Sequence, residues 1–245
     1  MADLEEAISM HRESLSLCPT PHPRRPTPLN NLAIALNDRF KKTGHMTDIE
    51  EAILILRESL TLCPTPHRDR HVSLNNLATA LLDRFRRTGL MTDLQEVISL
   101  YRESLSLRPT SHPSHSSSLS SLAIALQTHF RRTGSMIDLE EAILLHRESL
   151  SFRPTPHRDR FDSLNNLAHA LWDRYKKTGS MTDLDEANSM LREGLSLRSA
   201  ATHPHRLLAL RNLADILETR FKENGSESDL EKATSLRQEI LAMSE

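Results

Sequence analysis

The amino-acid sequence predicts an all-α fold, an α-solenoid built from antiparallel helix pairs with about eleven helices in all. Three observations predict it: a repeat of fixed length, apolar stripes with helical spacing inside each repeat, and glycine or proline where each helix should end. The repeat is visible in aspartates and glycines that recur every 45 residues, with one inserted residue before the last of each series. They are Asp3, Asp48, Asp93, Asp138, Asp183 and Asp229, and Gly44, Gly89, Gly134, Gly179 and Gly225. A period of this length is typical of solenoids, in which each unit buries its apolar face only against its neighbours.

The first helix of each unit is an amphipathic segment, as the second unit shows. Leu74, Leu77, Leu81 and Phe85 are separated by three or four residues, which places their side chains on one face of a helix. Two arginines follow, and cations favour the C-terminal end of a helix. Gly89 then ends the helix, because glycine readily adopts the conformation needed there.

The second helix of each unit begins with a capping pattern and ends at a proline. Thr92 stands at the expected N-cap with Gln95 three residues later, which predicts a capping box. Leu94 and Tyr101 belong to its apolar face, and Pro109 stops it. The same capping pattern recurs with Thr47 and Glu50, and with Ser228 and Glu231.

The same signals divide the whole chain into helices and units. The expected helices are 3–17, 28–42, 47–62, 72–87, 92–107, 117–132, 137–152, 162–177, 182–197, 205–223 and 228–243. We expect a single array over residues 1–245, with a half unit at 1–19 and units at about 20–64, 65–109, 110–154, 155–199 and 200–245.

Composition argues against several classes of function. The net charge of −2 and the aromatic content of 4% give no basis for binding nucleic acid. No run approaches the roughly 20 apolar residues of a membrane span, and the N-terminus lacks the pattern of a secretion signal, so we expect a cytoplasmic protein. Cys18 and Cys63 are expected to be free thiols. No catalytic set, metal site or cofactor-binding loop is apparent, so we expect no enzyme activity and no cofactor.

Small and large side chains follow a fixed pattern along the helix pairs. Ala33 lies on a first helix, and Ala52, Leu56, Ser59 and Pro64 follow along the next second helix at spacings of four, seven and twelve residues from Ala52. This pattern resembles the tetratricopeptide repeat family, and the resemblance implies a right-handed superhelix of antiparallel helix pairs. The units are longer than the family's usual length of about 34 residues. They resemble the long-unit arrays found beside CHAT or NB-ARC domains.

The resemblance also identifies a packing position on the second helices that the family usually fills with an aromatic residue. Its occupants are His11, Leu56, Tyr101, His146, Leu191 and Arg237. We expect the two histidines to be half-buried core residues rather than metal ligands.

A binding groove is expected where the first helices vary between units. The resemblance places this face on the concave side, where a protein or peptide segment would bind. The groove residues are Asn30, Ile34, Asn37, Asn75, Thr79, Leu82, Ser120, Ile124, Gln127, Asn165, His169, Trp172, Arg211 and Asp215. Asparagine amides offer both a donor and an acceptor to a peptide backbone, and a tryptophan can anchor a side chain. Two alternatives remain: the asparagines bond neighbouring helices, or the variable face is merely solvated.

Other features leave further alternatives open. One histidine recurs in each connector, and packing or capping of the connector is favoured over metal binding; these are His22, His67, His112, His157 and His203. The array could be the regulatory arm of a larger effector. It could also form homo-oligomers by end-to-end stacking, because Leu4, Ile8 and Leu15 of the first helix are expected to lack one of their packing partners.

Overall fold

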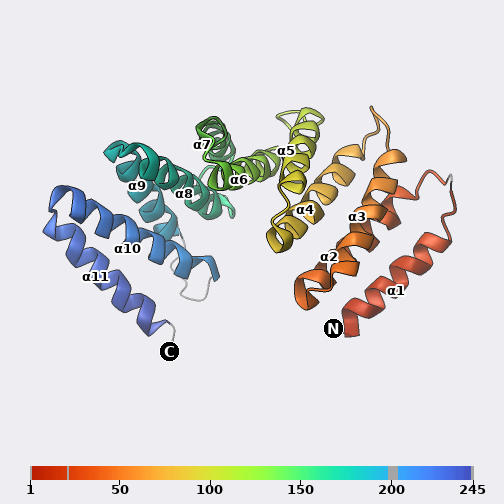
Figure 1. The fold of residues 1–245 in the computed structure, drawn as a ribbon, viewed down its shortest axis with the longest axis horizontal. Helices are drawn as coiled ribbons and strands as arrows, with labels where there is room; N and C mark the ends of the chain where they lie inside the picture. The colour runs from red at the N-terminus through yellow and green to blue at the C-terminus, as the bar shows by residue number, and fades with distance from the viewer. Residues whose placement is uncertain (1, 21, 198–203, 244–245) are drawn as a thin grey trace. The chain divides into compact units, whose positions relative to one another are not determined.

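The structure, a computed structural model, describes residues 2–20, 22–197 and 204–243 (Figure 1). These residues form eleven α-helices and no β-strand, which confirms the predicted all-α class. The helices are α1 (Ala2–Ser16), α2 (Pro26–Thr43), α3 (Met46–Thr61), α4 (Arg70–Thr88), α5 (Met91–Ser106), α6 (His115–Thr133), α7 (Met136–Ser151), α8 (Arg160–Thr178), α9 (Met181–Leu197), α10 (Pro204–Asn224) and α11 (Glu227–Ala242). Every helix begins one or two residues earlier than the sequence predicts.

The contacts divide the chain into two compact units, Met1–Ala125 and Leu126–Glu245, and the boundary falls within α6. Each unit is built from helix pairs. In the first unit α2 packs against α3, and α4 packs against α5. In the second unit α8 packs against α9, and α10 packs against α11. Leucines that recur from one first helix to the next are fully buried, with Leu29 and Leu74 in the first unit and Leu164 in the second.

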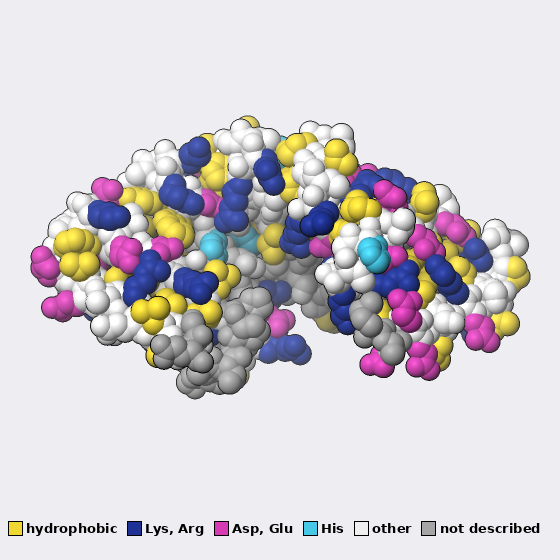
Figure 2. Space-filling view, turned by 60° about the horizontal axis from the view of Figure 1, so that its bottom comes forward, with side chains coloured by type: hydrophobic (Ala, Val, Ile, Leu, Met, Phe, Trp, Pro, Cys, Tyr) yellow, Lys and Arg dark blue, Asp and Glu magenta, His cyan; other side chains and the backbone are white. Residues whose placement is uncertain are grey.

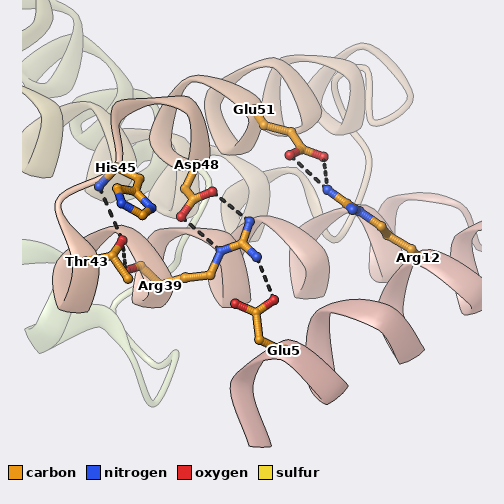
Figure 3. A network of polar contacts seen from close by, with 7 residues as sticks. All are labelled: Glu5, Arg12, Arg39, Thr43, His45, Asp48 and Glu51. Carbon is orange, nitrogen blue, oxygen red and sulfur yellow. Dashed lines mark hydrogen bonds and ion pairs between the residues drawn. The ribbon is translucent and has the colours of Figure 1, made fainter. Parts of the chain in front are cut away.

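The turn between the two helices of a pair is closed by glycine. Gly44 has a φ of 74°, a left-handed conformation that favours glycine, and its N–H donates to the carbonyl of Phe40 at 2.7 Å. The hydroxyl of Thr43 then accepts a hydrogen bond from the N–H of His45 at 3.3 Å (Figure 3). This arrangement ends α2 and starts α3 within a few residues.

The predicted capping boxes are wrong. Because α3 begins at Met46, Thr47 lies inside the first turn, and the N-cap residue His45 makes no side-chain cap bond. The same is true of α5, whose N-cap is Leu90, and of α11, whose N-cap is Ser226. The one-residue shift in helix start moves each threonine or serine away from the position where its hydroxyl could cap the helix.

The recurring aspartate has a different role, because it forms an ion pair across the turn. Asp48 is 4% exposed and accepts two hydrogen bonds from Arg39, at 2.9 and 2.7 Å (Figure 3). The pairs Arg84–Asp93 and Arg174–Asp183 have the same two-bond geometry, whereas His129 contacts Asp138 at 2.7 Å. Two parallel bonds between a guanidinium and a carboxylate fix both groups in orientation, so each of these pairs ties the end of one helix to the start of the next.

The connectors between pairs contain a turn closed by proline and histidine. The backbone N–H of each histidine donates to the carbonyl of the proline three residues earlier, at 2.7 to 2.9 Å. Its ring Nδ1 accepts from the N–H two residues later, at 3.1 Å. The residues are Pro19 and His22, Pro64 and His67, Pro109 and His112, and Pro154 and His157. The predicted capping role is confirmed for these four histidines, while His203 lies outside the described residues.

Burial also tests the expectations for the first helix and for the packing histidines. Ile8 is only 3% exposed and α1 packs against α2, so the expected lack of one partner does not leave Ile8 open to solvent; Leu4 and Leu15 are half-buried. His11 is half-buried, as predicted, whereas His146 is only 1% exposed and is therefore more deeply buried than predicted. Both cysteines are free, as predicted.

Candidate functional site

A pocket of about 240 Å³ lies between the first helices of the first unit, α2 and α4, with one residue from α3. It brings together three of the predicted groove residues, Ile34, Asn37 and Thr79. Ile34 is 45% exposed and offers an apolar surface at the mouth. The remaining lining residues are Ala33, Asp38, Lys41, Leu56, Asn76 and Ala80. The pocket therefore combines buried apolar residues with two amides, one carboxylate and one cation, a composition suited to holding a side chain.

The side chain of Asn30 does not line this pocket, because it forms hydrogen bonds with residues of neighbouring helices. It is 6% exposed, and its Nδ2 lies 2.8 Å from the carbonyl oxygen of Pro26 and 2.8 and 3.0 Å from the hydroxyls of Ser59 and Ser73. Its Oδ1 accepts a hydrogen bond from Asn76 at 2.8 Å. The structure thus assigns Asn30 to the alternative in which asparagine ties α2, α3 and α4 together.

Replacing Asn30 by alanine is expected to lower the free energy of unfolding by roughly 2 kcal/mol, because it leaves two buried serine hydroxyls and the amide of Asn76 short of partners. Urea denaturation followed by circular dichroism measures the change. Asn75→Ala is the matched control on the adjacent helix, since Asn75 is only half-buried. Equal losses in the two variants would contradict the proposed role of Asn30.

A buried aspartate on the following first helix, Asp83, contacts two of the residues that line the pocket, Asn37 and Lys41. Asp83 is 8% exposed and accepts a hydrogen bond from Nδ2 of Asn37 at 3.0 Å. It also pairs with Lys41 at 3.3 Å and with Arg86 at 2.9 Å. Sequence reasoning missed this residue, although Asp83 and Asp173 occupy the same position two units apart.

The same arrangement recurs in the second unit around Asp173. This carboxylate accepts from Gln127 at 2.8 Å and from Arg131 at 2.7 Å, and it pairs with Lys176 at 2.7 Å. Burial alone raises the pKa of Asp173, but the bond from Lys176 and the charge of Arg131 outweigh it, and the pKa lies below its usual value. Asp173 therefore stays ionised and holds the cations around it in fixed positions.

Basic pockets surround both aspartates at the C-terminal ends of first helices. In the first unit the pocket measures about 280 Å³, and in the second about 560 Å³. Every lining residue of the first pocket has a counterpart 90 residues later in the second: Phe40, Lys41, Gly44, Asp83, Arg86 and Arg87 correspond to Phe130, Arg131, Gly134, Asp173, Lys176 and Lys177. Arg132 and Thr133 also line the second pocket. On the described part of the face drawn in Figure 2, basic side chains are interspersed with acidic and uncharged ones.

Trp172 and His169 lie near the second of these pockets, on α8. Trp172 is half-buried, and the ammonium of Lys176 sits 4.9 Å from the centre of its ring, within the range of a cation–π contact. The ring Nε2 of His169 lies 2.6 Å from the amide nitrogen of Asn212, which ties α8 to α10. Burial lowers the pKa of His169, and the charge of Arg131 lowers it further, so the ring stays neutral near pH 7.

The predicted groove residues differ widely in their exposure. Buried side chains are Asn30, Asn37, Leu82, Ser120 and Gln127. Half-buried ones are Asn75, Ile124, Asn165, His169, Trp172 and Asp215, and exposed ones are Ile34, Thr79 and Arg211. The expectation of an open groove position is corrected for Asn30, Leu82, Ser120 and Gln127, because packing between helices covers them. Asn37 is also mostly buried, but it still contributes to the lining of the pocket between α2 and α4. Asp215 is also engaged within the fold, where it accepts from Arg237.

Within the described residues, no helix is both long enough and apolar enough to cross a membrane.

The comparisons with known proteins agree on the type of repeat. The family model described as "Tetratricopeptide repeat" matches residues 72–114, 116–159 and 161–205, which together exceed half of the 245 residues. No protein of curated function matches the chain.

Three solved structures illustrate the similarity of fold. One contains the nearly identical TPR-like repeats of a putative kinesin light chain from Podosopora anserina, at 21% identity and a TM-score of 0.63, and the match covers 90% of this chain and 98% of that one. Another is BtubC (BKLC) from P. vanneervenii, at 16% identity and a TM-score of 0.60, with coverage of 97% and 92%. A third is YrrB, described as a TPR protein with an unusual peptide-binding site, at 12% identity and a TM-score of 0.55, with coverage of 88% of each chain.

Proposed function

This chain belongs to the tetratricopeptide repeat family, and from that premise we propose that it is a non-enzymatic scaffold that binds a protein or peptide segment along its first helices. The observation that carries the proposal is the pocket between α2 and α4, which holds three of the residues expected in the groove. The description of YrrB as having a peptide-binding site supports the same use of the fold.

The pocket offers a peptide two kinds of contact. Ala33 and Ala80 are small, so a backbone can approach the floor closely, and the exposed side chain of Ile34 adds apolar area at the mouth. The hydroxyl of Thr79 donates to the carbonyl of Asn75, so towards a peptide it can accept a hydrogen bond from a backbone N–H. Lys41, which pairs with Asp83, has further N–H groups that can donate to a carbonyl or carboxylate oxygen. An apolar centre with polar groups at its rim is the usual anatomy of a binding surface.

Affinity capture from cell extract with mass spectrometry, followed by a binding assay with the purified partner, tests this proposal. Ile34→Glu and Thr79→Glu place carboxylates in the pocket at exposed positions, so the fold should be retained. The control is Leu54→Glu on α3, since Leu54 is 69% exposed and does not line the pocket. We expect the partner to be lost from the two pocket variants and retained by the control. Retention by all three variants would contradict the proposal.

A further inference from the structure

Ion pairs join the second helices of neighbouring repeats. Arg12 of α1 pairs with Glu51 of α3 at 2.9 Å (Figure 3), and Arg57 of α3 pairs with Glu96 of α5 at 2.8 Å. In the second unit, Arg147 of α7 makes the same pair with Glu186 of α9 at 2.7 Å. Partners in these pairs lie 39 residues apart in the sequence. A cation of one second helix and an anion of the next thus recur as a ladder, which we call the Arg–Glu ladder.

The Arg–Glu ladder is interrupted between α9 and α11. Arg192 continues the arginine series, but Lys232 occupies the position that Glu186 fills in the preceding repeat. Both side chains are exposed and line one pocket. Within residues 2–20, 22–197 and 204–243, neither has an ion-pair partner. Two like charges therefore line one pocket at a junction where the three pairs above have opposite charges, and like charges close to one pocket favour the binding of an outside anion.

The pocket that these two cations line has a volume of about 340 Å³ and is formed by α9, α10 and α11. Its apolar lining consists of Leu195, Leu210, Leu213, Leu217 and Leu236. Arg206 and Glu239 also line it and pair with each other at 3.2 Å, and Ser235 adds an exposed hydroxyl. An opening lined with leucine is therefore bordered by two unpaired cations and by groups that can accept or donate hydrogen bonds.

We propose that this pocket binds a peptide segment that inserts a leucine-sized side chain and places a neighbouring carboxylate between Arg192 and Lys232. The carboxylate restores the charge pattern of the Arg–Glu ladder, and the leucines provide the apolar contact. Ser235 and Glu239 favour a peptide over a fatty acid, because a peptide backbone brings N–H and carbonyl groups that need partners at the rim. A simple anion would leave the leucine surface in contact with water. This site is separate from the pocket on the first helices.

A titration of the full chain with a defined probe peptide, acetyl-Leu-Glu-Glu-Leu-amide, tests the proposal. Leucine methyl resonances report binding by NMR. We expect the methyl groups of Leu213 and Leu236 to shift, and we expect the affinity to fall about tenfold or more when glutamine replaces both glutamates of the probe. Dodecanoate serves as the fatty-acid probe. Shifts with dodecanoate but not with the peptide, equal affinity for the glutamine peptide, or no shifts at millimolar probe would each overturn the proposal.

Two variants locate the probe and control for folding. Lys232→Glu restores the pair seen at Arg147–Glu186, so it should fold at least as well as the native chain while losing the probe. Lys232→Gln removes the cation without adding an anion and should weaken binding to an intermediate degree. Thermal unfolding of both variants confirms that the fold is intact. Undiminished binding by a folded Lys232→Glu chain would overturn the assignment.

Discussion

Replacing Asp48 by asparagine is expected to lower the free energy of unfolding by about 3 kcal/mol. The two side chains have nearly the same shape, so the change isolates the loss of charge. Asp48 is 4% exposed and holds Arg39 through bonds of 2.9 and 2.7 Å. In the variant, the neutral amide of the new asparagine replaces the carboxylate, so the guanidinium of Arg39 loses its buried negative partner. Urea denaturation of the native and variant chains measures the difference.

Glu5 provides an internal control, because it binds the same arginine from the solvent side. Its carboxylate lies 2.8 Å from Nη1 of Arg39, but its side chain is 54% exposed (Figure 3). Water and salt screen a pair of this kind, so Glu5→Gln should cost less than about 1 kcal/mol. If the two substitutions cost the same, burial of Asp48 would not be what gives the turn pair its strength.

His146→Leu is expected to make the second unit more stable in acid, with a gain of about 3 kcal/mol near pH 4 relative to pH 7. Burial lowers the pKa of His146 from 6.5 to about 4, and the charges of Arg153 and His169 add to the effect. In the unfolded chain, this histidine therefore binds a proton below about pH 6.5. In the folded chain, it binds one only near pH 4. Stability is unaffected above that pH and falls progressively as the pH is lowered to about 4.

Leucine suits this position, because Leu56 and Leu191 fill it in other repeats. Denaturation at several pH values between 4 and 7.5 gives the difference in the free energy of unfolding between the native and variant chains. Other titrating groups contribute equally to both chains, so their contributions cancel in this difference. His11→Leu is the matched control, since His11 is only half-buried. A difference that does not grow as the pH falls would show that His146 is not held neutral by burial.

The helices could be predicted from the sequence because each depends on signals within a few residues of itself. Apolar spacing and terminal glycines placed all eleven within one or two residues of their observed starts. The role of the recurring aspartate could not be predicted in the same way. In the sequence, Asp48 marks the repeat period, but nothing there identifies its partner, Arg39, which lies nine residues earlier on the preceding helix. Only the geometry of the turn brings the two together.

The candidate site was less predictable, because variation between repeats has two physical causes. A position can vary because solvent tolerates any residue, as for exposed Ile34 and Thr79. It can also vary while keeping a bonding role, because side chains of different length can reach the same kind of partner. Asn37 donates to Asp83 and Gln127 donates to Asp173, and each pair is separated by 46 residues. In a single sequence, a position exposed to solvent and a position bonded to a neighbouring helix both look variable, and nothing in the sequence distinguishes the two causes.

The short range of the polar contacts has a consequence for how such a chain can change in length. The turn pairs join residues nine apart, the Arg–Glu ladder joins residues 39 apart, and the aspartate contacts of the first helices join residues 46 apart. A duplicated or deleted stretch of one full period leaves every partner at its accustomed distance along the chain, so copy number can drift during evolution while each junction keeps its bonds. The same locality favours rapid folding, since no contact of these kinds waits for the closure of a long loop.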